Sequence, residues 1–313
     1  METNFKTPIL FLIFNRPDVS QEVFNQIKIV KPMYLYVAAD GPRTDRTDDT
    51  KYCKQTREII NQVDWECDLK TLFRNENLGC GKAVSGAISW FFDQVECGII
   101  LEDDCMPDLS FFPYCEELLI KYKADEQVML IGGNNFQNGI IRGKGSYYFS
   151  HYPHIWGWAT WRRAWQHYDF SMKNIEYFFN TGIYKIFRTN KEIRYWKKKL
   201  DKVISGKINT WDYQWVYSIW INNGIAITPN TNLVINLGIR NSSTHTFLHD
   251  SYKEVKDFCE IKSPLVHPFL KIDKIADTAT FNNVFGHNLR RIIRLLKENK
   301  LLFLVYYTTR TKR

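Results

Sequence analysis

The sequence predicts an α/β protein with a doubly wound, mostly parallel sheet flanked by helices. Short apolar runs alternate with longer segments whose apolar residues recur at helical spacing, which is the pattern of β-α-β units. Each apolar run ends abruptly in polar or charged residues, as buried strands do at the edge of a sheet. With 313 residues and 44% hydrophobic content, the chain can bury a sizeable core.

Four strands and three helices are expected in the first third of the chain. The first helix is expected to begin at Ser20, which is a suitable N-cap, and two more cover Tyr52–Val63 and Lys82–Val95. The strands are apolar runs at residues 8–14, 33–39, 69–73 and 98–101.

The second half of the sequence is expected to form further helices and strands. Helices are expected over Phe111–Tyr122, within Ile175–Ser205, and from an N-cap at Thr210 through Ile221. Strands are expected at residues 128–131, 147–149, 224–229 and 233–238.

Polar side chains that follow the parallel strands should meet at one edge of the sheet. Ligands of such sheets bind at the carboxyl ends of the strands, so we expect Arg16, Asp40, Arg74 and Asp104 to gather there. The three consecutive acids Glu102–Asp104 repel one another, and an oxygen-seeking divalent cation carrying a phosphorylated substrate would offset them. A strand that simply ends in solvated acids is the alternative.

The charge pattern argues against a nucleic-acid-binding protein. The net charge of +8 is moderate, and basic residues are dense only over Arg188–Lys207 and from Arg290 to the C-terminus. Local anionic partners, either phosphates or a membrane surface, fit this placement.

Seven cysteines without a Cys-x-x-Cys pair, together with an N-terminus unlike a signal peptide, predict reduced thiols in a cytoplasmic protein. No apolar stretch is long enough for a transmembrane helix.

Glycine-rich phosphate motifs are scarce. Neither the dinucleotide-binding pattern nor a P-loop occurs in the chain. The segment Gly79–Lys82 opens a helix, where backbone amides and Lys82 could hold phosphate, although glycine-rich helix starts are common.

Taken together, these motifs resemble the nucleotide-diphospho-sugar transferases, the GT-A type of glycosyltransferase. The resemblance covers residues 8–246 and is greatest to the N-acetylglucosaminyltransferase I group and its bacterial relatives. The segments that carry it, in family order, are Asn15-Arg16-Pro17, Asp40-Gly41, Glu102-Asp103-Asp104, Gly157-Trp158 and Trp211-Asp212.

The resemblance implies a role for each matched residue. Arg16 and Asp40 would contact the nucleotide, Asp104 would bind Mn²⁺ or Mg²⁺ bridging the diphosphate, and Glu102 and Asp103 would face the sugar. The identity of the sugar does not transfer. Arg74 joins the nucleotide-sugar side by its position, and Lys82 is a physical guess for the diphosphate. Without the resemblance, Asp40 is equally a turn former and Arg16 a solvated loop residue.

Asp212 matches the catalytic base of the inverting enzymes. Such a base takes the proton of the acceptor hydroxyl as its oxygen attacks the anomeric carbon. At a helix N-terminus we expect its pKa to be lowered by the helix dipole and amide hydrogen bonds. The alternative is an acid in the first turn of a helix, worth about 0.3–1 kcal/mol.

Four other residues are weaker candidates. Among the clustered tryptophans, most of which should be core, Trp158 beside Gly157 is the one expected to contact the sugar. His245 would complete the metal shell or touch phosphate, with a histidine of no role as the alternative. Asn134 and Asn135 follow a strand and could bind acceptor hydroxyls.

The chain is expected to divide at residue 250. Residues 1–250 would form the transferase domain, with a nucleotide-sugar half at 1–110 and an acceptor half at 111–250. Residues 251–313 would be an extension whose basic amphipathic helix, Arg290–Arg313, lies on an anionic membrane or packs on the domain.

The function predicted from these features is a metal-dependent, inverting glycosyltransferase. It would move a sugar from a UDP-sugar to a glycan or lipid-linked glycan acceptor in bacterial cell-surface polysaccharide or lipopolysaccharide assembly, at the inner face of the cytoplasmic membrane. Two alternatives are a nucleotidyltransferase on a similar fold and a non-catalytic carbohydrate-binding or membrane-associated protein. The first alternative needs a glycine-rich basic loop after the first strand, and Asn15–Asp18 is not one.

Overall fold

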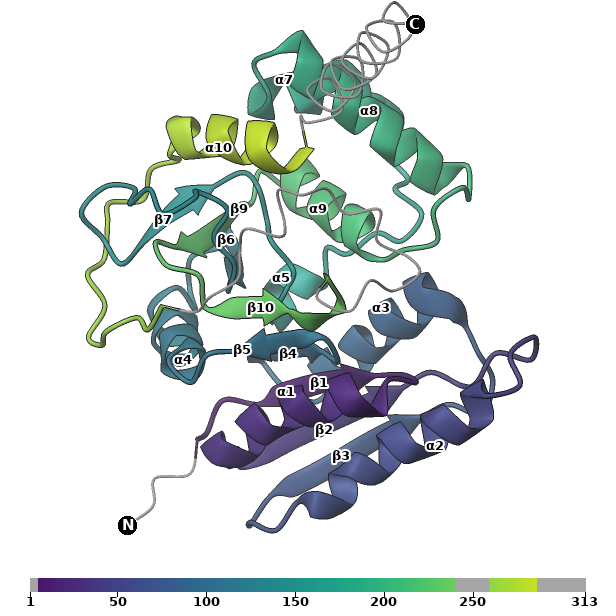
Figure 1. Cartoon of the computed structure of the whole chain (residues 1–313). Coiled ribbons are helices and arrows are strands. Elements are labelled where there is room, and N and C mark those ends of the chain that lie inside the picture. Colours follow the sequence, from purple (N-terminus) through teal and green to yellow (C-terminus); the bar gives the residue numbers. More distant parts are fainter. Residues whose placement is uncertain (1–4, 240–258, 286–313) are drawn as a thin grey trace, which may run out of the picture.

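The computed structural model confirms the α/β class, with a central eight-stranded, mostly parallel sheet flanked by helices (Figure 1). The structure describes residues 5–239 and 259–285. The boundary expected at residue 250, His245 and the helix expected over Arg290–Arg313 all lie outside the described residues.

The sheet has the strand order β3-β2-β1-β4-β8-β6-β9-β7. The first four strands in this order are parallel, whereas β8 runs antiparallel to both of its neighbours and β7 antiparallel to β9. The strands of the main sheet are β1 (Ile9–Ile13), β2 (Tyr34–Ala39), β3 (Asp68–Phe73), β4 (Cys97–Glu102), β6 (Val128–Gly132), β7 (Tyr147–Ser150), β8 (Trp158–Trp161) and β9 (Ile225–Pro229). A small antiparallel pair, β5 (Cys105–Pro107) and β10 (Val234–Asn236), lies beside it.

The helices connect these strands and cover the sheet. They are α1 (Pro17–Val30), α2 (Asp49–Glu58), α3 (Gly79–Phe92), α4 (Phe111–Lys121), α5 (Arg162–Trp165), α6 (Ile175–Tyr177), α7 (Ile183–Ile186), α8 (Asn190–Ile204), α9 (Asp212–Ile221) and α10 (Lys274–Thr280). Short 3₁₀ or π segments occur at η1 (Ile59–Gln62), η2 (Phe178–Gly182), η3 (Leu237–Ile239) and η5 (Phe281–Phe285).

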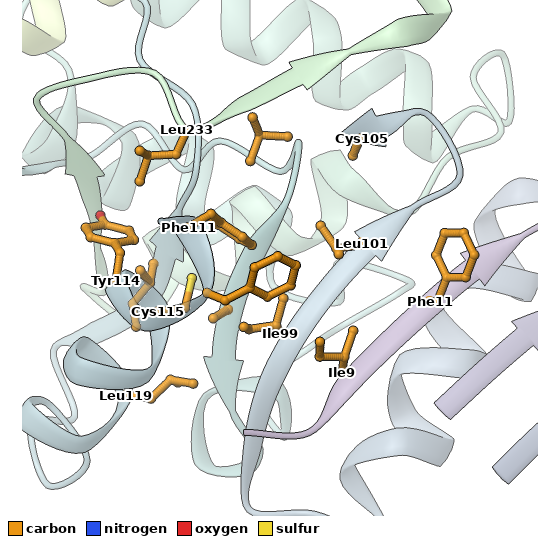
Figure 2. Close-up of a cluster of buried hydrophobic side chains, with 14 of the residues drawn as sticks. Ile9, Phe11, Ile99, Leu101, Cys105, Phe111, Tyr114, Cys115, Leu119 and Leu233 are labelled. Atoms are coloured by element: carbon orange, nitrogen blue, oxygen red, sulfur yellow. The ribbon is translucent and has the colours of Figure 1, made fainter. Parts of the chain in front are cut away.

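Alternation along the strands divides the core into two apolar layers. Ile9, Phe11 and Ile13 of β1 face a layer with α1 and α4, part of which is shown in Figure 2. Leu10 and Leu12 face the opposite layer, with α3 and α9. Both faces of β1 and β4 are therefore buried, which explains why these two strands are unbroken apolar runs, whereas β3 at the edge of the sheet is partly exposed and contains polar residues.

Two predicted N-caps, Ser20 and Thr210, are wrong for local reasons. Helix α1 begins at Pro17, whose fixed φ suits the first helical position, and the Ser20 hydroxyl donates to the Arg16 carbonyl at 2.7 Å inside the first turn. The Thr210 hydroxyl does not cap α9, because it donates to the carboxylate of Asp212 instead.

Strands β5 and β8 were not expected from the sequence. Residues 158–161 read Trp-Ala-Thr-Trp and are completely buried, so they show no alternation of polar and apolar side chains. Strand β5 has only three residues and is defined by its pairing with β10, about 130 positions further along the chain.

Replacement of Gly98 tests how closely β4 packs against its neighbours. A Cβ at Gly98 would lie 2.8 Å from the Pro8 carbonyl oxygen and 2.4 Å from the Phe91 ring. We expect Gly98→Ala to lower the free energy of unfolding by about 1–3 kcal/mol, measured by urea denaturation. Gly86→Ala in α3 is the matched control, because a Cβ there meets only the flexible end of Arg74, at 3.2 Å. The control should be neutral or stabilising, and equal losses for the two variants would contradict this reading.

Candidate functional site

The ends of β1 and β4 bring Arg16 to the acidic triplet. The two strands are parallel, with Leu12 opposite Glu102, so the loops that follow them leave the sheet at the same level. The guanidinium of Arg16 donates from Nε to Asp103 Oδ2 at 3.3 Å and from Nη1 to Asp104 Oδ2 at 3.1 Å. Its Nη2 also donates to Asp103 Oδ1. Arg16 therefore clamps two of the three acids, in an arrangement that combines charge and hydrogen bonding.

One arginine does not neutralise three carboxylates. Burial, and after it the charges of Asp104 and Asp103, raises the pKa of Glu102 well above its ordinary value. Burial also raises the pKa of Asp103, against the opposing effect of Arg16. On Arg16 itself, burial acts to lower the pKa, but the two aspartates raise it above the usual value. The end of β4 thus holds an excess of negative charge that is shielded from water.

The segment after β10 covers Asp104. The Leu237 amide donates to the Asp104 carbonyl at 2.7 Å, and β10 pairs antiparallel with β5 just beyond the triplet. A Cβ at Gly238 would lie 2.7 Å from Asp104 Oδ2, so only a glycine allows this close approach.

The donor set at this edge fits a hard divalent cation. Carboxylate oxygens are the ligands that Mg²⁺ and Mn²⁺ prefer, and the unbalanced charge around Glu102 favours a positive ion. Among residues 5–239 and 259–285, no group of three or more His, Cys, Asp or Glu side chains could hold a metal by itself. A cation here would therefore take further ligands from substrate phosphate and water, as Mg²⁺ commonly does.

Asp40 lies at the end of β2 and caps α3. Its carboxylate accepts hydrogen bonds from the amides of Leu78, at 3.0 and 3.1 Å, and Gly79, at 3.0 Å. Arg57 joins the ends of β2 and β3, because its Nη2 donates to the carbonyl oxygens of both Asp40 and Arg74. Asp40 is therefore placed at the predicted edge, where its carboxylate stabilises the start of a helix.

The glycine-rich start of α3 is not an open phosphate cradle. Besides the two amides bonded to Asp40, the amide of Gly81 donates to Asn209 Oδ1 at 3.1 Å. A Cβ at Gly81 would lie 2.7 Å from Asn209 Oδ1 and 2.8 Å from the Thr210 carbonyl, so the glycine permits this docking. Within Gly79–Lys82 the amides of Gly79 and Gly81 are therefore bonded to protein oxygens, and phosphate binding by this segment stays a prediction. Lys82 is exposed on α3.

Docking of Asn209 brings Asp212 to the same edge. Asp212 accepts from the Thr210 hydroxyl and, at 2.8 Å, from the Tyr213 amide. Burial nevertheless raises its pKa, and these hydrogen bonds and Lys199 only partly oppose the rise. The expected lowering is therefore wrong, because desolvation outweighs the helix terminus here.

Cys80 is a site residue that sequence reasoning missed. Cys80 is exposed, yet desolvation by the surrounding protein raises the pKa of its thiol to about 12, and the next largest effects come from Glu102, Asp212 and Asp40. The negative charge of Asp212 likewise raises the pKa of Glu102. Carboxylates from β2, β4 and α9 thus converge on the start of α3, and the Gly-Cys-Gly sequence there was the signal available.

Three predicted contacts do not fit the structure. Trp158 is fully buried and stacks on Trp211, with ring centroids 5.7 Å apart, so it has no free face for a sugar. Asn134 donates to the Val234 carbonyl at 3.0 Å and Asn135 to the Pro229 carbonyl at 2.7 Å. Both amides are buried and bind the backbone of neighbouring segments rather than facing an acceptor.

Comparisons with known proteins give only distant similarity. Neither the scan of protein-family models nor the search of curated proteins found a match. Among solved structures, HddC from Yersinia pseudotuberculosis is 10% identical with a TM-score of 0.31, covering 50% of this chain and 77% of that one. Mouse xyloside xylosyltransferase 1, in its apo form, is 8% identical with a TM-score of 0.31, and the match covers 78% of this chain and 86% of that one.

Within the described residues, no helix is both long and apolar enough to cross a bilayer.

Replacing Asp40 tests whether its carboxylate caps α3. We expect Asp40→Ala to lower the free energy of unfolding by about 1 kcal/mol, because two amides of α3 lose their acceptor. Asp40→Asn keeps a side-chain oxygen at the cap and should cost less. Urea denaturation of both variants measures the difference, and equal stability of Asp40→Ala and the unmodified protein would exclude the capping role.

Proposed function

We propose that this protein is a metal-dependent, inverting glycosyltransferase that moves a sugar from a UDP-sugar to a glycan acceptor. The main support is that the largely shielded acidic triplet and Asp212 meet at one edge of the sheet. The triplet at the end of β4 is clamped by Arg16, and Asp212 at the start of α9 lies near enough to raise the pKa of Glu102. The motif resemblance described above points to the same reaction.

The triplet would serve the leaving group. Departure of UDP places negative charge on a diphosphate, and a divalent cation bound there supplies the neutralisation. Asp104 is the residue that would hold the cation, and Asp103 keeps Arg16 in place beside it. The charge of Asp212 contributes to the raised pKa of Glu102, and we infer that Glu102 would face the transferred sugar.

Asp212 would remove the proton of the acceptor hydroxyl. A general base works best when its pKa lies toward the working pH, and burial moves the pKa of Asp212 in that direction. Transfer should then fall as the pH is lowered through this raised pKa, since only the ionised carboxylate accepts a proton. A single base opposite the leaving group gives inversion at the anomeric carbon.

The finer assignments rest on the motif resemblance. They are the kinship with the N-acetylglucosaminyltransferase I group and a role in bacterial cell-surface polysaccharide or lipopolysaccharide assembly, whereas a cytoplasmic location is inferred from the cysteine pattern. A panel of UDP-sugars incubated with Mn²⁺ tests the reaction class directly. Release of UDP supports a glycosyltransferase, whereas release of pyrophosphate from a nucleoside triphosphate and a sugar phosphate would favour a nucleotidyltransferase.

Asp104→Ala should abolish Mn²⁺-dependent binding of UDP, because the protein then lacks its proposed metal ligand. Isothermal titration of UDP with and without Mn²⁺ measures this. Asp93→Ala is the control, since it removes one exposed carboxylate at the far end of α3. Metal-dependent UDP binding that persists in Asp104→Ala would refute the assignment.

Asp212→Asn should keep UDP binding and lower the transfer rate about 10²–10⁴-fold, the usual contribution of a general base. The amide keeps the size of the side chain and an oxygen that can accept from Thr210 and Tyr213. Asp201→Asn, an exposed position on α8, is the control. Transfer at the unmodified rate in Asp212→Asn would exclude Asp212 as the base.

A further inference from the structure

Helix α8 carries an unusual concentration of positive charge. Between Lys185 and Lys207 the chain has nine basic residues and only two acidic ones, Glu192 and Asp201. Glu192 is buried and is used inside the protein, since it forms the capping box with Thr189 and accepts from the Tyr152 hydroxyl at 3.2 Å. Almost all of the exposed charge on this helix is therefore positive.

The basic residues form a single stripe on the outer face of α8. Lys191, Arg194, Lys198 and Lys202 follow one another at intervals of three, four and four residues, and all four are exposed. This spacing places them on one side of the helix, over about 16 Å of its length. The opposite side is buried in an aromatic cluster through Ile193, Trp196, Leu200 and Val203. In Figure 1, α8 lies at the periphery of the molecule.

The stripe is not compensated by the rest of the described chain. The ion pairs found within residues 5–239 and 259–285 include none from these four side chains. The one side-chain hydrogen bond recorded for them runs from Arg194 Nε to the Asn190 carbonyl, at 3.1 Å, and leaves the positive charge unpaired. Such an arrangement is costly through self-repulsion unless an anionic partner binds.

The shape of the stripe favours an extended anionic surface, rather than a single phosphate, as its partner. A single phosphate is held by cations that converge on it in a hollow, whereas these side chains leave a convex helix face side by side. Two exposed apolar side chains lie beside the stripe: Tyr184 is 55% exposed, and Ile204 of α8 itself is 47% exposed. Lys197 lies 5.5 Å above the Tyr184 ring, which joins this apolar fringe to α8. Tyrosines beside lysines are typical of segments at the lipid headgroup level.

We propose that the outer face of α8 docks the protein on an anionic phospholipid surface, through Lys191, Arg194, Lys198 and Lys202. The cations pair with lipid phosphates and Tyr184 lies among the headgroups. Helix α8 packs against α9, so this contact brings the membrane to the same side of the molecule as the helix that begins with Asp212. The contact does not depend on the proposed reaction, because it requires no nucleotide or sugar.

Vesicle co-sedimentation of the full chain tests this docking. The full chain should sediment with phosphatidylcholine vesicles that contain phosphatidylglycerol and remain in solution with phosphatidylcholine alone, with less binding at high salt. Replacing all four stripe residues by Gln should weaken the binding at least about tenfold, since each cation near an anionic surface contributes. The control replaces four exposed lysines elsewhere by Gln, namely Lys123, Lys144, Lys262 and Lys271, and removes the same charge.

Each outcome decides the proposal. Equal weakening in both variants would show that only net charge matters, and unchanged binding in the stripe variant would place the contact elsewhere, for example in residues 286–313. Either result overturns the proposal. Duplex DNA that binds the stripe more tightly than the vesicles do would overturn it in favour of nucleic acid. Circular dichroism and thermal unfolding of both variants confirm that the fold is intact.

Discussion

The packing of three consecutive carboxylates at the end of β4, of which Asp103 is buried and Glu102 and Asp104 are half-buried, is the constraint on which this site depends. Strand β4 is paired with β1 on one side and β8 on the other, so the residues that leave it cannot withdraw into solvent. A buried, unpaired charge costs several kcal/mol. The pKa values of Glu102 and Asp103 are raised for the same reason, because desolvation disfavours their ionised forms. Arg16 offsets part of it because Pro17 starts α1 directly after this residue and fixes where its side chain begins.

The start of α3 organises the remaining acids. Its first amides are bonded to Asp40 from β2 and to Asn209 from the segment before α9. These bonds satisfy a helix terminus that would otherwise need water or an anion. They also join two segments that are 169 residues apart in the chain, and they leave the carboxylates of Asp40 and Asp212 around Cys80. The helix terminus thus holds together the segments that carry Asp40 and Asp212.

Sequence reasoning predicted those features that depend on local pattern. The strands from Ile9 to Glu102 and the meeting of Arg16 with Asp104 follow from apolar runs and parallel pairing. The pKa of Asp212 could not be predicted in this way, because burial by distant segments outweighs the effect of its own helix. The capping role of Asp40 was hidden for a similar reason, since its partners Leu78 and Gly79 lie on another element. Local sequence gives the residue types at the edge, whereas tertiary packing decides which of them keep a free oxygen.

Trp158 belongs to the matched Gly-Trp segment, but its role in the site is to position other residues. It lies on β8 opposite Ile100 of β4, only two residues before Glu102. Its ring stacks on Trp211 at an interplanar angle of 19°, and Trp211 directly precedes Asp212. The stack therefore fixes the start of α9 relative to the end of β4, which are the two elements that supply the proposed base and the acidic triplet. Aromatic residues beside a catalytic motif need not touch the sugar, because holding two carboxylates in register is an equally specific demand on shape.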